Sequence, residues 1–273
     1  MITPTWATGP GRPSLRAQRL LADGVGLILL ASWALAARAE GPGTTGSDPG
    51  RILSLAGQLL FDPGYAKHTY SSFVRVLLAG VIAVGLGTAL MIAARFLPLT
   101  RILIAHRLLP ILNAVPTVSW AILAVVWLGV NDIAVVAVIA AILLPFTMVN
   151  VWAALLGLDE ELYEMAKAFT RDRRRRLRLV VIPAILPAVV ASARLSFGVG
   201  WKVGIVAELF GVTTGLGYLL SYARTVYDTE LIYAVTGVLV ALVVAVDGLA
   251  FTRLERLLTR HRADATFAPI PAR

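Results

Sequence analysis

The sequence predicts an all-α integral membrane protein with six transmembrane helices. Of its 273 residues 58% are hydrophobic, and the mean hydropathy is +0.79, far above what a soluble domain needs. The apolar residues form runs of about 20, the length that a helix needs to cross a bilayer core about 30 Å thick. These runs are rich in Ala, Leu and Val without alternation, which indicates helices rather than strands.

The predicted spans are separated by short polar connections and flanked by two tails. Met1 to Arg19 is expected to be a disordered cytoplasmic tail rather than a cleavable signal. Residues 20–262 are expected to form the six-helix domain, and residues 263–273 a cytoplasmic C-terminal tail. We place the spans at Leu20 to Ala37, Phe73 to Ala94, Leu108 to Leu128, Ile133 to Leu156, Val180 to Ala207 and Leu231 to Thr252.

The charge distribution predicts how these spans are oriented. The net charge is +9, and most Lys and Arg residues lie in the two tails, in the second connection and in the fourth. Because Lys and Arg are retained on the cytoplasmic side, both termini are expected to be cytoplasmic. The opposite connections carry fewer basic residues and several acids, and we assign Arg75, Asp132 and Glu208 to them.

Two further features of the connections and spans predict local structure. The turn-rich loop after the first span contains an apolar stretch, Ile52 to Phe61, that is expected to form a short interfacial helix. Prolines within or beside the spans can kink or break helices, although prolines are also common in membrane helices without such a role. They are Pro110, Pro116, Pro145, Pro183 and Pro187.

A basic amphipathic insertion, Asp159 to Arg178, lies between the fourth and fifth spans. Its acidic start favours a helix N-terminus, and Leu162, Ala166 and Phe169 share one face at helical spacing. Lys167 and the following arginines are expected to close this helix. A helix so short is marginal alone, so we expect it to dock against a protein surface. For the arginines alone, a solvated loop touching lipid phosphates is the alternative.

The residues of this insertion also match a known signature. Glu164-Met165-Ala166, Thr170 and Val180-Val181-Ile182-Pro183 resemble the E-A-A-x3-G-x9-I-x-L-P loop of permease subunits of binding-protein-dependent ATP-binding-cassette importers. Thr170 stands where the family has Gly, and a Thr with positive φ would be strained. Either the turn differs, or this subunit docks its ATPase differently, as half of a heteromeric pair.

Shorter pieces extend the resemblance from about His68 to His261, towards taurine, alkanesulfonate, nitrate and bicarbonate permeases. They are Ser72 to Leu77, Val115-Pro116, Trp127-Leu128-Gly129, Arg194, Gly198, Gly200-Trp201, Ala207-Glu208-Leu209 and Gly215 to Tyr218. The resemblance implies a type I importer (MetI-like) fold in a bacterial cytoplasmic (inner) membrane. It also implies a second permease subunit, two cytoplasmic ATPase subunits that hold ATP and Mg, and an extracytoplasmic binding protein.

The resemblance implies two sets of site residues. The ATPase-coupling loop, at about residues 157–179 with the proline that follows it, is expected to act through Glu161, Leu162, Glu164, Met165, Ala166, Phe169, Thr170 and Pro183. The translocation path is expected to include Lys202, Trp201, Pro116 and Glu208. Lys202 could draw an anionic substrate through the path, or it could pair with Glu208 of the partner subunit.

Two other charges lie inside predicted spans. For Arg194 a structural role is favoured. For Asp247, pairing with an interfacial arginine is favoured over a proton relay.

Other function classes find less support in the sequence. It has no cysteine, and its three histidines are scattered, so no metal site, disulfide or cofactor is expected. It lacks a G-x-x-x-x-G-K-[ST] segment and a convergent catalytic constellation, so the chain is not expected to be an enzyme. The expected cargo is a small anion such as a sulfonate or nitrate, or a related organic solute. A pyrimidine or vitamin precursor, an aromatic acid and ion-coupled secondary transport are the alternatives, and no nucleic acid partner is expected.

Overall fold

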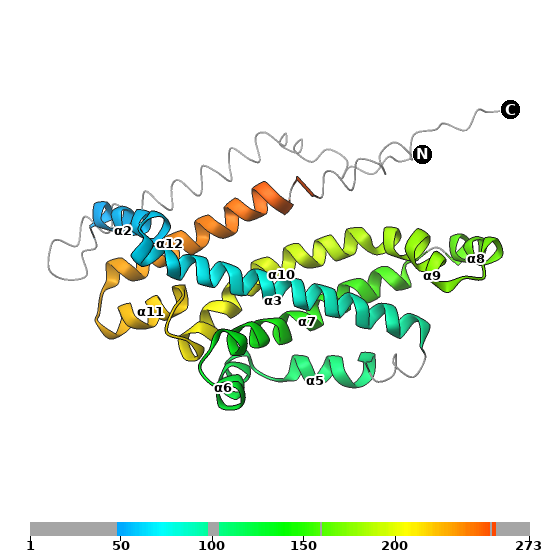
Figure 1. Ribbon diagram of the computed structural model, residues 1–273, viewed down its shortest axis with the longest axis horizontal. Coiled ribbons are helices and arrows are strands. Elements are labelled where there is room, and N and C mark those ends of the chain that lie inside the picture. The colour runs from blue at the N-terminus through cyan, green and yellow to red at the C-terminus, as the bar shows by residue number, and fades with distance from the viewer. Residues whose placement is uncertain (1–47, 98–103, 159, 252, 255–273) are drawn as a thin grey trace, which may run out of the picture. The chain divides into compact units, whose positions relative to one another are not determined.

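The computed structural model describes residues 48–97, 104–158, 160–251 and 253–254, and the part it describes is helical (Figure 1). The first predicted span and both tails lie outside these residues. The chain divides into two compact units, Met1–Ser54 and Leu55–Arg273, and the described helices from α3 onward belong to the second unit. The elements are α2 (Pro49–Phe61), α3 (Pro63–Phe96), η2 (Ile104–Leu108), α5 (Leu109–Ala114), α6 (Thr117–Leu128), α7 (Asp132–Leu156), α8 (Glu160–Phe169), α9 (Arg173–Arg176), η3 (Leu177–Val181), α10 (Ile182–Gly211), α11 (Leu216–Thr225), α12 (Thr229–Val246) and η4 (Asp247–Phe251).

Four helical runs among the described residues are long and apolar enough to cross a membrane. They are Pro63–Phe96, Asp132–Leu156, Arg173–Gly211 and Thr229–Phe251, and they correspond to the second, fourth, fifth and sixth predicted spans. The short helix expected at Ile52 to Phe61 is also present, as α2.

The third predicted span is wrong as a single helix. The structure divides Leu108 to Leu128 into the end of η2, α5 and α6, with a break at Val115 and Pro116. Val115 is extended, with φ −83° and ψ 122°, and Pro116 has ψ 144°. Steric conflict with the proline ring disfavours helical backbone at the preceding residue, which accounts for the break. The 12-residue α6 is about 18 Å long at 1.5 Å per residue, too short to cross the bilayer core alone.

The second span begins earlier than predicted. Asp62 caps α3 by accepting a hydrogen bond from the backbone N–H of Gly64 at 2.7 Å, and Pro63 occupies the first turn, where its missing N–H is tolerated. Arg75, which the charge pattern assigns to a loop although the predicted span begins at Phe73, lies well inside this helix.

The core of the second unit lies where α3, α7 and α10 pack side by side (Figure 1). Two glycines of α10 allow the close approach. A Cβ at Gly204 would lie 3.0 Å from Val76 of α3, and one at Gly200 would lie 3.2 Å from the same valine and 3.3 Å from Leu143 of α7. Val76 and Leu143 are buried, so a larger residue at either glycine would displace the core.

Candidate functional site

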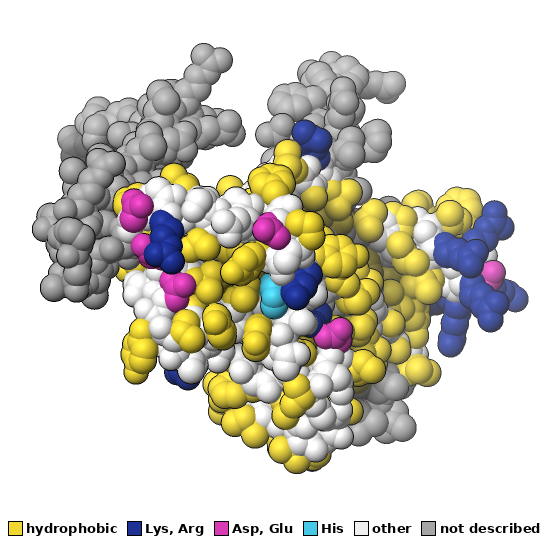
Figure 2. Space-filling view, turned by 60° about the vertical axis from the view of Figure 1, so that its left-hand side comes forward, with side chains coloured by type: hydrophobic (Ala, Val, Ile, Leu, Met, Phe, Trp, Pro, Cys, Tyr) yellow, Lys and Arg dark blue, Asp and Glu magenta, His cyan; other side chains and the backbone are white. Residues whose placement is uncertain are grey.

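Basic side chains gather at the end of the second unit that carries α8 and α9, as the dark blue patch at the right of Figure 2 shows. The exposed members of this group are Arg171, Arg173, Arg174, Arg175 and Arg178. At the opposite end lie the start of α3, the end of α10 and α11 (Figure 1). The two ends therefore differ in chemistry, one of them being strongly cationic.

Helix α8 presents an exposed stripe that differs from the predicted face. Ala166 is buried, whereas Phe169 is 83% exposed and Met165 is 53% exposed. Glu161, Met165 and Phe169 follow each other at intervals of four residues, so they form one exposed stripe along α8. The side chain of Leu162 lies outside the described residues. Two large apolar side chains in water beside many arginines indicate a surface that another protein covers.

The arginine run does not close α8, which corrects our expectation. Helix α8 ends at Phe169, and the arginines form α9, the start of the next helical run. The reason is Asp172, whose carboxylate accepts a hydrogen bond from the backbone N–H of Arg174 at 2.9 Å. Aspartate is a preferred N-cap, so Asp172 begins a new helix where the arginines start. From Arg173 the chain stays helical to Gly211.

The turn after α8 needs no left-handed residue. Thr170, at the position of the family glycine, is not among the described residues with positive φ. Its N–H donates to the carbonyl of Ala166 at 3.1 Å, and its hydroxyl accepts from the N–H of Asp172 at 3.3 Å. Of the two alternatives left open by the sequence, the structure supports a different turn. Pro183 lies just after the π-helical turn η3, inside the helical run that begins at Arg173.

Tyr163 joins α8 to two other helices, and we did not predict this role. The guanidinium carbon of Arg95, near the end of α3, lies 5.6 Å from the centre of the Tyr163 ring. That of Arg176, which is buried at the end of α9, lies 5.9 Å from the same centre. Each contact is a cation–π interaction. Tyr163 is flanked in the sequence by Leu162 and Glu164, so no local pattern indicated its basic partners, which belong to other helices.

A buried polar network occupies the opposite end of the second unit. The carboxylate of Glu208 accepts hydrogen bonds from the Ser72 hydroxyl at 2.7 and 2.9 Å, from Arg75 Nη1 at 2.6 Å and from the Gly217 N–H at 2.9 Å. Glu208 is 2% exposed. The pairing of Glu208 with a partner subunit's Lys202, one of our alternatives, is therefore wrong, because Glu208 is enclosed within its own chain.

Arg75 connects this network to further elements. Its guanidinium also contacts Asp132 Oδ1 at the start of α7 at 2.7 Å and the Thr214 carbonyl before α11 at 2.8 Å. The charge pattern assigned Arg75, Asp132 and Glu208 to connections on one side of the membrane. The structure places all three at the same end of the second unit, but within helices rather than in loops. Arg75 and Glu208 are buried helix residues that pair with each other at 2.6 Å.

The loop before α11 fits closely around Glu208. Gly215 has φ +119°, which favours glycine, and its N–H donates to His68 Nδ1 at 3.1 Å. A Cβ at Gly215 would lie 2.5 Å from the Glu208 carboxylate, and a Cβ at Gly217 would lie 2.5 Å from the backbone oxygen of Ile205. Gly215 is therefore required by space as well as by backbone conformation, and Gly217 by space.

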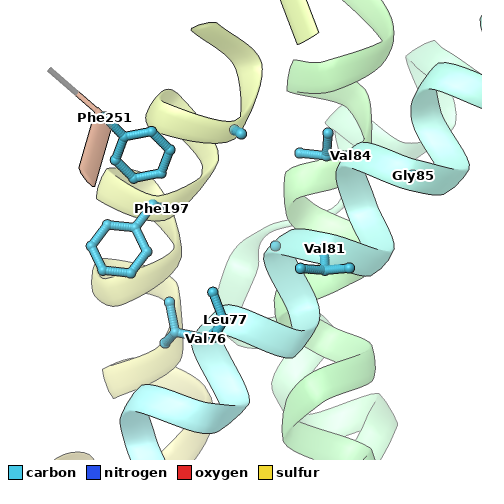
Figure 3. Close-up of a pocket in the computed structure, with 9 residues that line it drawn as sticks. Val76, Leu77, Val81, Val84, Gly85, Phe197 and Phe251 are labelled. Atoms are coloured by element: carbon cyan, nitrogen blue, oxygen red, sulfur yellow. The ribbon is translucent and has the colours of Figure 1, made fainter. Parts of the chain in front are cut away.

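Trp201 lies in the core, 1% exposed, against Phe73 and Phe197 with ring centres 6.3 and 6.0 Å away. Phe197 also borders an apolar pocket of about 330 Å³ between α3, α10 and η4, where Phe251 faces it (Figure 3). Trp201 and Glu208 are thus enclosed by their own chain, while Pro116 is exposed at the break before α6. Their role in the path stays a prediction, and the geometry favours it least for Trp201 and Glu208.

Lys202 is exposed and lies elsewhere, in a groove between α10 and α12 of about 490 Å³. Arg194 and Asp247 also line this groove and form a two-point ion pair, with Nε–Oδ1 at 2.6 Å and Nη2–Oδ2 at 2.7 Å. The predicted pairing of Asp247 with an arginine is confirmed, but the partner lies in a neighbouring membrane helix. The structural role favoured for Arg194 is supported by the same contact.

The family model for "Binding-protein-dependent transport system inner membrane component" matches residues 83–263. The chain belongs to this family and is the permease subunit of an ATP-binding-cassette importer. Membership implies an ATPase and a substrate-binding protein as partners, and an inner-membrane location. The resemblance inferred from the 159–183 segment is thereby confirmed at the level of the family.

Relatives place the chain near the sulfonate branch. It is 30% identical over 196 residues to the permease protein SsuC of Bacillus subtilis, whose name refers to aliphatic sulfonates, covering 71% of this chain and 70% of that one. It is 28% identical to the taurine transport system permease TauC of Escherichia coli, covering 77% and 76%. It is 32% identical to the riboflavin transport system permease RibX of Chloroflexus aurantiacus, covering 56% of each.

A solved structure shares the fold. The inward-facing MetNI methionine transporter matches with a TM-score of 0.59 and 21% identity, over 71% of this chain and 93% of that one. This similarity supports the predicted MetI-like fold.

Proposed function

We propose that this permease subunit imports a small sulfonate-type anion and that α8 is the contact through which a cytoplasmic ATPase drives it. In this proposal two permease subunits, identical or different, bind two ATPase subunits that hold ATP and Mg. A binding protein delivers substrate at the end formed by α11 and the start of α3. The chain crosses the inner membrane six times with both termini in the cytoplasm.

The exposed stripe of α8 is the observation that carries the proposal. Met165 and Phe169 present apolar surface on the exposed side of α8, and burying a phenyl ring contributes about 1.5 to 3 kcal/mol. The contacts of Tyr163 and the helical run from Arg173 then connect the docked helix to α10. Movement of an ATPase attached to α8 is thus transmitted to the helix that bears Lys202.

The substrate class is supported by the relatives and by charge. SsuC and TauC are named for sulfonate and taurine transport, and Lys202 supplies a cation in a groove of the second unit. Because RibX is named for riboflavin transport, a vitamin-type substrate is the second candidate. A riboflavin-type cargo carries no sulfonate, so its transport would not require Lys202.

The proposal is tested with the permease purified with its ATPase and reconstituted with its binding protein. Phe169→Ala removes the most exposed ring of the stripe, so we expect binding of the ATPase to weaken about tenfold or more, with uptake reduced in proportion. Pull-down of the ATPase and uptake of labelled taurine or ethanesulfonate measure the two effects.

Phe61→Ala is the matched control. Phe61, on α2, has the same exposed fraction of 83%, so the same atoms are removed from an equally exposed site. We expect this variant to bind the ATPase and transport like the parent chain. Equal ATPase binding by both variants would contradict docking through α8.

A further inference from the structure

The groove between α10 and α12 has an ordered arrangement of charge. Arg194, Gly198 and Lys202 follow each other at intervals of four residues, so they form one stripe on α10. Across the groove, Val243 and Asp247 belong to α12 and η4. The two cations are separated by about 12 Å along the helix, and Gly198 lies midway between them.

Gly198 leaves the floor of the groove open. A Cβ built at this residue meets nothing within 4 Å, in contrast to Gly200 and Gly204, which pack tightly against α3. Gly198 is therefore not required for packing against any helix in the described part of the chain. Its effect is to leave space between two basic side chains.

Among the described residues that line the groove, the charges sum to one positive charge. Asp247 neutralises Arg194 through two short contacts, and no ion pair or hydrogen bond of Lys202 occurs among the described residues. A cation inside a membrane helix is costly unless water or an anion faces it. The arrangement thus suits a ligand with a single negative charge.

The position of the groove along α10 favours a free anion over a lipid headgroup. Arg194 lies about 18 Å along α10 from Ile182, and Lys202 about 13 Å from Gly211, at 1.5 Å per residue. Both residues are therefore expected to lie within the hydrocarbon core, Arg194 deeper than Lys202, whereas headgroups lie outside it.

We infer that Arg194, Gly198 and Lys202 form a binding site for one small monoanion, of the sulfonate class, with Asp247 as the counter-ion that limits the ligand to a single charge. This inference rests on the proposed function, because it assigns the anion's site along the path. It goes further in naming the floor of the site and the residue that sets its charge.

The absence of cysteine from the chain provides a direct test. A single thiol is introduced by Gly198→Cys, and the permease–ATPase complex in lipid membranes is treated with two methanethiosulfonate reagents. One carries an ethylsulfonate, and the other a trimethylammonium group of similar size. We expect the sulfonate reagent to be favoured about tenfold over the cationic one, because an opposite charge nearby raises its local concentration.

The matched control is Gly237→Cys. Gly237 is an exposed α12 residue with equally open space, outside the groove lining, and the ratio of rates measured there corrects for intrinsic reactivity. Adding Lys202→Met to Gly198→Cys should abolish the preference, whereas Lys202→Arg should retain it. A preference that survives Lys202→Met would overturn the proposal, and so would labelling at Gly198→Cys without any preference. Failure of both reagents to label Gly198→Cys would also overturn it, because the groove would then face lipid or protein.

These outcomes are independent of the proposed function. ATPase binding and coupled uptake are measured on the unmodified chain and on Phe169→Ala. If those succeed while the reagents show no preference, the importer assignment stands and the anion site fails. If ATPase binding fails while the preference is present, the anion site stands and ATPase docking through α8 fails.

Discussion

At the scale of single residues, the Glu208 carboxylate holds together parts of the chain that are far apart in sequence. It receives hydrogen bonds from α3, through Ser72 and Arg75, and from the N–H of Gly217 at the start of α11. Each hydrogen bond to a charged group contributes about 1.5 to 3 kcal/mol, and a buried donor left without a partner is destabilising by a similar amount. The stability of the bundle at the end opposite α8 therefore depends on the Glu208 carboxylate.

We predict that Glu208→Ala lowers the free energy of unfolding by about 3 kcal/mol or more, because it leaves Arg75, Ser72 and the Gly217 N–H without their shared acceptor. The midpoint of thermal unfolding in detergent measures the effect. Glu164→Ala is the control, since Glu164 forms an exposed pair with Lys167 worth at most about 1 kcal/mol. Equal midpoints for the two variants would contradict a structural role for the network.

The sequence could not predict this network. Arg75 and Glu208 are 133 positions apart, so no local pattern links them. A hydropathy window also assigns charged residues near a span end to the adjoining loop, whereas each charge here is stabilised inside a helix by the other. Asp247 was easier to interpret, because a lone acid in a membrane helix requires a basic partner.

At the scale of elements, α8 is held between the cytoplasmic ends of two long helices, in the proposed orientation. The Tyr163 ring contacts Arg95 of α3 on one side and Arg176 of α9 on the other. Cation–π contacts contribute about 0.5 to 2 kcal/mol each, depending on exposure. The helix is thus fastened to both α3 and the α9–α10 run rather than carried on a free loop.

We predict that Tyr163→Ala reduces uptake per ATP hydrolysed about three- to tenfold, because α8 can then move without moving α10. Tyr163→Phe keeps the ring and should behave like the parent chain. Uptake and phosphate release are measured in the same proteoliposomes. A normal ratio in Tyr163→Ala would show that the ring contacts do not transmit the motion.

Local sequence signals predicted these elements unevenly. The existence of α8 followed from its acids and apolar spacing, and α2 from its apolar stretch. The end of α8 was missed because basic residues suit the last turn of a helix, whereas here the cap Asp172 starts a new helix at the arginines. Proline effects were recognised, but whether Pro116 kinks or breaks its helix depends on what replaces the lost hydrogen bonds.

At the scale of the whole molecule, charge predicts the orientation. The exposed arginines of residues 171–178 lie at the end of α8 and α9, and the Asp132–Glu208 network lies at the other. Because basic residues are retained in the cytoplasm, α8 is proposed to face the cytoplasm and α11 the exterior. The first span and both termini lie outside the described residues, so their orientation stays a prediction.

Single introduced thiols test this topology in a chain without cysteine. In intact cells a membrane-impermeant maleimide should label Tyr227→Cys, whose residue is 90% exposed after α11. Arg171→Cys, Ser14→Cys and Ala272→Cys should be labelled only after the inner membrane is permeabilised. Labelling of Ser14→Cys in intact cells would contradict six spans with both termini inside.

The continuous helical run from Arg173 to Gly211, in which α9, η3 and α10 follow one another, has a mechanical consequence. Its 39 residues span about 58 Å at the α-helical rise of 1.5 Å per residue. Pivoting a rod of this length by about 5° at the arginine end displaces its far tip by about 5 Å, roughly the diameter of a small ion with part of its water shell. A modest swing delivered to one tip is therefore amplified by length alone into a displacement wide enough to open or shut a passage.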